Sequence, residues 1–508
     1  MGDFSVILAG FADAFTLYNL MFALFGVIVG QFVGAVPGIG PVIAMAIAIP
    51  FTFSMNALPA IAFLVGVMKG GLVGGSIPAV LINTPGTPDA AATALDGYPL
   101  CQQGKALKAT KMALFASVTG DTFSDIVLIT VSAPLAILAL KMGPVEIAAL
   151  IIFAFSILTG LVGKSLTKGA ISAILGLLGS TVGADPENYT PRFIMGQYEL
   201  YDGFSLISVA IGSLAVSEVL RRLAVSRGGQ IAAVTVKNSD NPDDNRVTWA
   251  EYYSCRFVML RGALIGTILG ALPGIGSTAA AFMSYLATKN ASKDPGSFGK
   301  GNIQGIAAAE SANSAVVGAN LIPLLTLGIP GSVGAALIIS AFMIHGIQPG
   351  PLLFRDQGQL IYGLFGAMLM SNLINLWVGQ LGLRLWVKVV SAPESLIFSA
   401  TILLCTVGVW MATGGAFGLF CMLMFAVLGY LMTAFGYSVV IFMIAFFLGP
   451  QLETSIAQGL VLTNGELTQL VKHPVALALF GLAIASFVWF IYKVKTQPAD
   501  VEAEEVID

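Results

Sequence analysis

One block of glycine and proline residues occurs twice in this chain, and this duplication constrains the fold more than any other feature of the sequence. Residues 30–40 read GQFVGAVPGIG and residues 266–276 read GTILGALPGIG. Four glycines and one proline keep their places in both copies. Because self-similarity inside one chain is the signature of a duplicated architecture, we predict two related halves.

A second pair of motifs follows the two copies. The run NTPGTP at residues 83–88 matches the run LGIPGS at residues 327–332, and a proline precedes each run. Proline and glycine interrupt helices, so we predict a helical hairpin in each half, over residues 70–98 and 319–336, with these runs as the tips. The same residues also suit surface turns, but their apolar flanks argue against that alternative.

The composition places these halves in a membrane. Of 508 residues, 56% are hydrophobic and 10% are charged, whereas soluble domains carry roughly 25% charged residues. Four apolar runs approach or reach the roughly 20 residues that a helix needs to cross a bilayer: residues 17–36, 147–162, 396–411 and 475–492. No stretch alternates polar and apolar residues at period two, which excludes an outer-membrane barrel. We predict an all-α polytopic membrane protein with about 10–12 transmembrane helices.

A polar linker, residues 221–256, separates the predicted first transmembrane repeat, residues 1–220, from the second, residues 257–492. The linker is rich in arginine and lysine, so the positive-inside rule places it in the cytoplasm. No basic residue precedes Lys69, which favours the opposite side for the N-terminus and gives the first repeat an odd number of crossings. The two repeats are then inverted relative to each other, as in many secondary transporters.

The C-terminal part fits this scheme less simply. Lys493 and Lys495 flank the last apolar run and favour a cytoplasmic end, whereas two equal odd halves return the chain to the outside. One extra crossing or one re-entrant pair would resolve the difference, and residues 439–448 are the candidate segment. The acidic tail, residues 493–508, is predicted to be disordered.

The PGIG runs predict broken helices at membrane depth. Proline lacks a backbone N–H and glycine leaves helical geometry readily. Such breaks are tolerated only where they are buried in protein or line a wet cavity. The freed carbonyl groups can bind a cation and the freed N–H groups an anion; a packing kink is the alternative. The residues assigned to a coupling cation on this ground are Pro37, Gly38, Gly40, Pro273, Gly274, Gly276 and Ser277.

The two hairpin tips offer amide and hydroxyl donors with exposed N–H groups, a neutral cradle suited to carboxylates. Few basic residues lie near enough to neutralise such a ligand, Lys69 among them. Asp89, just after the first tip, is predicted to cap the helix that follows. The residues assigned to substrate binding are Asn83, Thr84, Pro85, Gly86, Thr87, Gly328, Pro330, Gly331 and Ser332.

Acidic side chains within apolar segments are the remaining candidates. Glu310 and Asn313 share one helix face, and a carboxylate inside a membrane is costly enough to be a functional hypothesis by default. We assign both residues to the coupling cation, Na⁺ or H⁺; the alternative places Glu310 at the membrane interface as a cap. Asp121 and Asp125 either serve a cation or occupy a helix end near Lys111.

Several function classes lack their motifs. The four cysteines form no CxxC pair and the two histidines lie far apart, so no metal or redox motif can be built. No GxSxG, HExxH or P-loop sequence is present, and we predict no enzymatic activity and no cofactor. A formal charge of −3 gives no reason to expect nucleic acid as a partner.

Three segments carry a resemblance to a known family: GAVPGIGP paired with GALPGIGS, NTPGTPDAAATALDGYP, and ESANSAVVGANLIPLLTLGIPGS. They resemble the large membrane subunit of the tripartite tricarboxylate transporters, the TctA family, over about residues 16–490. The resemblance implies a secondary carrier, driven by a cation gradient, that imports carboxylates such as citrate across the bacterial inner membrane. It also implies two partners, a small TctB-like membrane subunit and a periplasmic TctC-like binding protein that delivers the substrate.

The resemblance extends to individual residues and to the fold. Paired hairpins are similar to those of elevator-like carriers, at the level of the fold alone. The competing interpretation is a gated channel or passive pore for small organic anions, which needs a polar stripe through several helices. The positions that match the family's signature blocks are Pro37–Gly40, Asn83–Thr87, Pro273–Gly276, Glu310, Asn313 and Leu327–Ser332.

Overall fold

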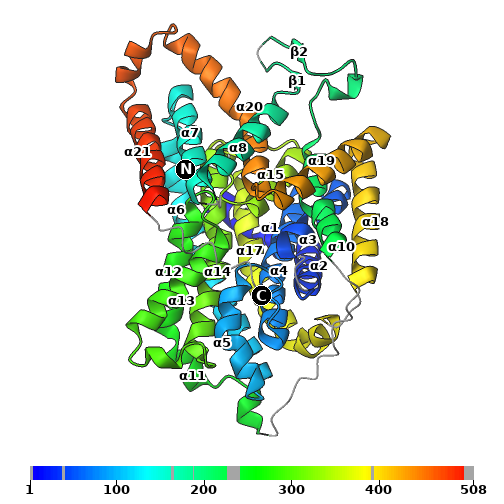
Figure 1. Cartoon of the computed structure of the whole chain (residues 1–508), viewed down its shortest axis with the longest axis vertical. Coiled ribbons are helices and arrows are strands. Elements are labelled where there is room, and N and C mark those ends of the chain that lie inside the picture. The colour runs from blue at the N-terminus through cyan, green and yellow to red at the C-terminus, as the bar shows by residue number, and fades with distance from the viewer. Residues whose placement is uncertain are drawn as a thin grey trace. The chain divides into compact units, whose positions relative to one another are not determined.

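The computed structural model describes residues 4–36, 40–161, 165–186, 188–225, 241–390 and 394–496. Its helices form two compact units (Figure 1), one made of Met1–Leu140 and Ser205–Leu431 and the other of Lys141–Phe204 and Met432–Asp508. Several parts of the predicted segments lie outside the described residues: residues 37–39 with Pro37 and Gly38, residues 226–240 of the polar linker, residues 497–508 of the acidic tail, and residues 1–3, 162–164, 187 and 391–393 of the two repeats.

The larger unit holds most of the helices. Its α-helices are α1 (Phe4–Ala14), α2 (Leu17–Gly34), α3 (Gly40–Ala48), α4 (Ala57–Ile82), α5 (Ala90–Gln102), α6 (Ala106–Ala139), α9 (Leu206–Ala210), α10 (Ser217–Val225), α11 (Trp249–Ser254), α12 (Arg256–Ala271), α13 (Gly276–Ala291), α14 (Ile303–Leu327), α15 (Val333–Ile344), α16 (Leu353–Asp356), α17 (Gly358–Val390), α18 (Glu394–Thr413) and α19 (Ala416–Ala434). A π-helical turn, Ile211–Val216, joins α9 to α10. The 3₁₀ turns are Ile49–Ser54, Pro242–Asn245 and Pro295–Ser297.

The smaller unit contains four α-helices and a short hairpin. Its elements are α7 (Pro144–Leu161), α8 (Leu166–Ser180), β1 (Gly183–Ala184), β2 (Pro191–Arg192), α20 (Val439–Leu462) and α21 (Pro474–Thr496), with 3₁₀ turns at Tyr198–Leu200 and Leu467–Lys472. β1 pairs with β2 in antiparallel fashion.

Seven of the described helices are long and apolar enough to cross a membrane, and shorter apolar helices accompany them. This confirms the prediction of an all-α polytopic membrane protein. The seven are α2, α4, α6, α17, α19, α20 and α21. Residues 439–448, the candidate segment for one extra crossing or a re-entrant pair, are the first part of α20, which continues through Pro450 as one helix of 24 residues. That length suits a complete crossing.

Glycines bring two helix pairs into backbone contact. A Cβ on Gly30 of α2 would overlap the carbonyl oxygen of Val67 in α4, and a Cβ on Gly266 of α12 would overlap the carbonyl oxygen of Ala312 in α14. Small residues permit this approach between helices in a membrane. The predicted halves therefore use the same packing at matching glycines.

The second helix of each predicted hairpin packs against the other half. α5, from the first half, lies against α13 and α14, and α15, from the second half, lies against α3 and α4. The long helices follow the same rule, because α6 packs along α14 and α17 packs along α4. Each predicted half therefore completes the core of the other within the larger unit.

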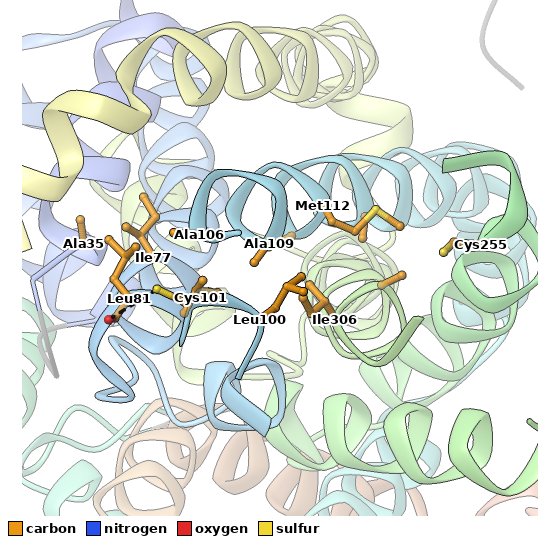
Figure 2. Close-up of a cluster of buried hydrophobic side chains, with 14 of the residues drawn as sticks. Ala35, Ile77, Leu81, Leu100, Cys101, Ala106, Ala109, Met112, Cys255 and Ile306 are labelled. Atoms are coloured by element: carbon orange, nitrogen blue, oxygen red, sulfur yellow. Dashed lines mark hydrogen bonds between the residues drawn. The ribbon is translucent and has the colours of Figure 1, made fainter. Parts of the chain in front are cut away.

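A buried apolar cluster fixes the first hairpin in place (Figure 2). Ile77 of α4, Leu100 of α5 and Ile306 of α14 are each no more than 5% exposed. Met112 of α6 is fully buried among them, and Cys255 closes the cluster at the start of α12. The tip between α4 and α5 is thus held by apolar packing on α6 and α14.

The described part of the polar linker packs against the N-terminal end of α6. Lys108 Nζ donates a hydrogen bond of 2.7 Å to Glu251 Oε1, and Lys105 lies 3.3 Å from Asp244. Thr248 and Glu251 form a capping box at the start of α11. Partial burial raises the pKa of Glu251. The hydrogen bonds from Lys108 and Thr248 outweigh this effect and hold the pKa below its usual value.

The smaller unit is held by helix packing and by polar contacts between side chains. α20 packs against α7 and α8, and α21 packs against α7. A Cβ on Gly176 of α8 would overlap the carbonyl oxygen of Phe442 in α20. Arg192 of β2 pairs with Glu453 of α20. Loop residue His473 lies 2.7 Å from the Glu146 carboxylate at the start of α7.

Candidate functional site

The first hairpin has the predicted tip. α4 contains Pro78 and ends at Ile82, and Asn83 adopts a left-handed conformation with φ 54°. The Thr84 N–H donates to the carbonyl oxygen of Pro78 at 3.3 Å. Asn83 and Thr84 are exposed, whereas Gly86 and Thr87 are buried. The tip therefore presents polar groups on one side and packs on the other.

The second hairpin repeats this geometry. α14 contains Pro323 and ends at Leu327, and Gly328 has φ 73°. The Ile329 N–H donates to the carbonyl oxygen of Pro323 at 3.2 Å, at the position that matches Thr84. Ser332 caps α15, because its hydroxyl accepts the Ala335 N–H at 3.2 Å. Gly328, Pro330 and Gly331 are buried.

The helix break of the second half is present, and the described residues at both PGIG runs contact the tip of their own half. α12 ends at Ala271 and α13 begins at Gly276, with Gly274 at φ 89°. The Gly274 N–H donates to the carbonyl oxygen of Gly331 at 2.9 Å. In the first half, Gly40 begins α3 at φ 66°, and a Cβ there would lie 3.7 Å from Thr87.

Matching glycines also join each tip to the helix before its break. A Cβ on Gly86 would overlap the carbonyl oxygen of Gly34, at the end of α2. A Cβ on Gly331 would lie 3.2 Å from the carbonyl oxygen of Gly270, near the end of α12. The same contact therefore occurs at equivalent positions of the two repeated sequences.

Asp89 links the first tip to the second half. It is 3% exposed, and the side chains of Thr87, Asn313 and Ser277 lie near its carboxylate. Asp89 occupies the N-cap position of α5 but makes no side-chain capping bond, so the capping prediction is wrong. Three sequence-predicted residues, Thr87, Ser277 and Asn313, thus meet around a residue that was assigned another role. We call these four residues the tip junction.

The tip junction contains polar atoms without hydrogen-bond partners among the described residues. They are Asp89 Oδ2 and the amide oxygen and nitrogen of Asn313. Ser314 Oγ and Asn320 Oδ1 of α14 also lack partners among the described residues, and all four side chains are buried. Burial of an unpaired polar group is costly, and buried polar groups are normally hydrogen-bonded. The chemistry of this set, a carboxylate with amide and hydroxyl groups, suits a cation or a polar ligand.

Glu310 lies deep in the larger unit, next to the tip junction. It is fully buried in α14 and accepts hydrogen bonds from Thr93 Oγ1 of α5 at 2.5 Å and from Ser117 Oγ of α6 at 2.7 Å. Glu310 therefore neither caps a helix end nor extends to the protein surface, as the alternative had it. Asp89 is an electrostatic neighbour of Glu310.

A second polar group, which we call the Lys69 cluster, consists of Lys69, Asp121, Asp125 and Asn372. Lys69 Nζ of α4 lies 2.5 Å from Asp125 Oδ2 and donates to Asn372 Oδ1 of α17 at 2.7 Å. Asn372 Nδ2 donates to Asp125 Oδ2 at 2.8 Å. All four side chains are at most 2% exposed. Asp121 and Asp125 are thus inside α6 and not at a helix end near Lys111, so that alternative is wrong.

Asp96 is a buried carboxylate of a different kind. Its Oδ1 accepts the N–H groups of Gly299, Gly301 and Asn302 at 2.8–2.9 Å, and its Oδ2 accepts the Tyr285 hydroxyl at 2.9 Å. Every donor comes from the other half, so Asp96 holds α5 against the segment that begins α14. Four hydrogen bonds hold its carboxylate in place, so we interpret Asp96 as a structural residue.

Replacing Asp96 by alanine is expected to destabilise the fold by about 3 kcal/mol, because each buried donor left unsatisfied costs roughly 1–3 kcal/mol. Thermal unfolding of the detergent-solubilised protein measures the loss. Tyr285→Phe is the matched control, since it removes one hydrogen bond from the same carboxylate and should cost about 1 kcal/mol. Equal losses for the two variants would show that the N–H groups of Gly299, Gly301 and Asn302 do not depend on Asp96.

The structure brings the predicted residues together only in part. Thr87, Ser277 and Asn313 meet at Asp89, and Gly40 and Gly274 of the PGIG runs lie at the tips of their own halves. Ser332 instead uses its hydroxyl as a helix cap. Lys69 and Asn372 form a buried group for which the spacing of residues gave no sign, although a lysine inside an apolar run is itself a signal.

Comparisons with known proteins agree with the resemblance in the sequence. Residues 20–444 match the family described as the tripartite tricarboxylate transporter TctA family. An "uncharacterized 52.8 kDa protein in TAR-I ttuC' 3'region" of Agrobacterium vitis is 34% identical over 94% of both chains. An "uncharacterized protein in TAR-II ttuC' 3'region" of the same organism is 36% identical, covering 43% of this chain and 90% of its own. No solved structure matches the chain.

Proposed function

The chain belongs to the tripartite tricarboxylate transporter TctA family, and we propose that it is the large transport subunit of a cation-coupled secondary carrier that imports tricarboxylates or related carboxylates. The proposed partners are a small TctB-like membrane subunit and a periplasmic TctC-like protein that delivers the substrate. The proposed location is the inner membrane of a bacterium. Multiple apolar helices support a multi-pass membrane protein.

The observation that carries the proposal is the buried, incompletely paired Asp89 carboxylate where tip, helix break and α14 meet. A substrate carboxylate at this point would be repelled by Asp89 in a low-dielectric interior. A cation bound between them removes the repulsion, and oxygen groups such as Asp89 Oδ2 and Asn313 Oδ1 are ligands that hard cations prefer. Substrate binding would then require the cation, which is the condition for coupled transport.

Backbone groups supply the other half of the proposed site. Lys69 already pairs with Asp125 and is not available to neutralise a substrate. The N-terminal ends of helices bind anions through free N–H groups, and α13 and α15 both begin at these breaks and tips. We therefore assign the substrate carboxylates to the N–H groups of the tips and the coupling cation, Na⁺ or H⁺, to the tip junction.

Uptake of labelled citrate and other carboxylates into proteoliposomes tests this function. The liposomes hold the chain with its small subunit, the binding protein is added outside, and a Na⁺ or H⁺ gradient is imposed. We expect accumulation above the outside concentration, which a passive pore cannot produce. Equilibration without accumulation under every gradient would favour the alternative, a gated channel for small organic anions.

Replacing tip residues is expected to abolish most of this uptake. Asn83→Leu and Ser332→Leu remove polar groups from the two tips. Matched controls exist in the smaller unit: Asn464 is also a left-handed asparagine in an exposed turn, with φ 50°, and Ser438 also caps a helix through a 3.2 Å bond. Asn464→Leu and Ser438→Leu should keep uptake near the wild-type rate. Unchanged uptake in both tip variants would overturn the site assignment.

A further inference from the structure

Asp121 is the one carboxylate of the Lys69 cluster that lacks a close partner. Its nearest oxygen lies 3.8 Å from Lys69 Nζ, beyond hydrogen-bond distance, whereas Asp125 lies at 2.5 Å from the same atom. Neither oxygen of Asp121 has a hydrogen-bond partner among the described residues, and the side chain is 1% exposed. Lys69 and Asn372 both bind Asp125, so neither of them donates a hydrogen bond to Asp121.

The charges around Asp121 do not balance. The charged groups that face it are Lys69 of α4, Asp125 of α6 itself and Glu310 of α14, while α17 presents the neutral Asn372. The group therefore contains one ammonium group and three carboxylates, counting Asp121 itself. An isolated ionised carboxylate is strongly disfavoured in such an interior and takes up a proton instead.

A proton fits this position better than a metal cation. A metal ion bound to Asp121 would sit beside the Lys69 ammonium group, and like charges repel strongly at low dielectric. A Na⁺ ion also needs several oxygen ligands, but Lys69 and Asn372 direct their donors at Asp125 and leave Asp121 without further ligands. A proton needs only one carboxylate oxygen.

We propose that Asp121 binds and releases a proton that is coupled to carboxylate transport, at a site separate from the tip junction. The proton forms an O–H bond with one Asp121 oxygen and leaves as H⁺ on the opposite side of the membrane, so no other reactant is required. This inference rests on the proposed transport function. It chooses Asp121 over Asp125 and a proton over a metal cation, which the sequence had left open.

From its position, Asp121 can affect the tip junction electrostatically when it gains or loses a proton. α6 packs on α14 so closely that a Cβ on Gly120 would overlap the carbonyl oxygen of Ser311. Asp121 interacts electrostatically with Glu310, and Glu310 with Asp89. The charge state of Asp121 therefore acts on the same row of carboxylates that ends at the tip junction.

Infrared difference spectra test the proton site without any substrate. Between acidic and alkaline buffer, the wild-type protein should show a protonated-carboxyl band that is missing from Asp121→Asn and present, shifted, in Asp121→Glu. Identical spectra for wild type and Asp121→Asn would overturn the proposal. Ser132→Ala is the control for a change in α6, because Ser132 is also buried without a partner, and it should keep the band.

Transport assays separate coupling from substrate binding. In Asp121→Asn, accumulation driven by a proton gradient should be lost, while exchange of labelled for unlabelled carboxylate across the liposome membrane should persist, since exchange needs no net proton movement. Asp121→Glu should restore accumulation. Proton-driven accumulation by Asp121→Asn, or loss of exchange together with accumulation, would overturn the proposal. Absence of any carboxylate transport by the wild type would instead refute the proposed function and leave the infrared result to decide the proton site.

Discussion

Replacing Lys69 by methionine is expected to destabilise the protein by about 3–5 kcal/mol, because the substitution leaves a buried carboxylate without its partner. Lys69 is fully buried and is bound to Asp125 and Asn372. Methionine has a similar length and fills the space, so the loss reports the charge and not a cavity. Thermal unfolding in detergent and the yield of monodisperse protein measure the effect.

The double variant Lys69→Met with Asp125→Asn should recover most of this loss. Removing both partners of a buried ion pair is often close to neutral, whereas removing one is not. Lys168→Met is the control, since Lys168 is exposed and donates to a carbonyl oxygen, and it should change stability by less than about 0.5 kcal/mol. A double variant no more stable than Lys69→Met would show that the pair is not the source of the effect.

Leucine at Gly30 or at Gly266 is expected to cost about 3 kcal/mol or more, because overpacking of a close helix contact forces the backbones apart. Both glycines touch a carbonyl oxygen of the neighbouring helix, where no side chain can move away. Because the two positions are equivalent in the repeat, the two variants should suffer alike. Unfolding temperature and the fraction of folded protein after extraction measure the loss.

Gly481→Leu supplies the matched control for these variants. Gly481 lies in α21, and a Cβ there would meet no atom within 4 Å. Leucine at this position should stabilise the helix by up to about 1 kcal/mol, because glycine is a poor helix former. Equal behaviour of Gly30→Leu and Gly481→Leu would contradict the assignment of Gly30 to a backbone contact.

The hairpins and the helix breaks were predictable because proline and glycine act locally. Pro78 and Pro323 fall near the ends of α4 and α14, and Gly274 and Gly276 adopt positive φ values at the break before α13. These conformations depend on the chemistry of one or two residues. The all-α membrane class followed from the apolar composition, whereas the number of crossings stays a prediction.

The centre of the candidate site was not predictable in this way. Asp89 follows a proline and precedes a helix, a context typical of a cap, and only the packing of α5 against α13 and α14 brings Ser277 and Asn313 to it. The partners of Lys69 come from α6 and α17, which are distant in the sequence. Contacts of this kind depend on tertiary packing, which a local sequence pattern does not reveal. The inverted orientation of the repeats stays a prediction.

Because the two halves exchange helices, parts of the chain that are synthesised early can pack fully only after later parts have been made. α5 and α6 leave the ribosome long before α13 and α14, against which they pack, and α3 and α4 precede α15 by an even longer stretch of chain. Until then, the Asp96 carboxylate of α5 lacks its hydrogen-bond donors from the other half. The first repeat is therefore incompletely folded in the membrane until the second repeat has been synthesised. We expect truncated chains that end in the linker to be degraded.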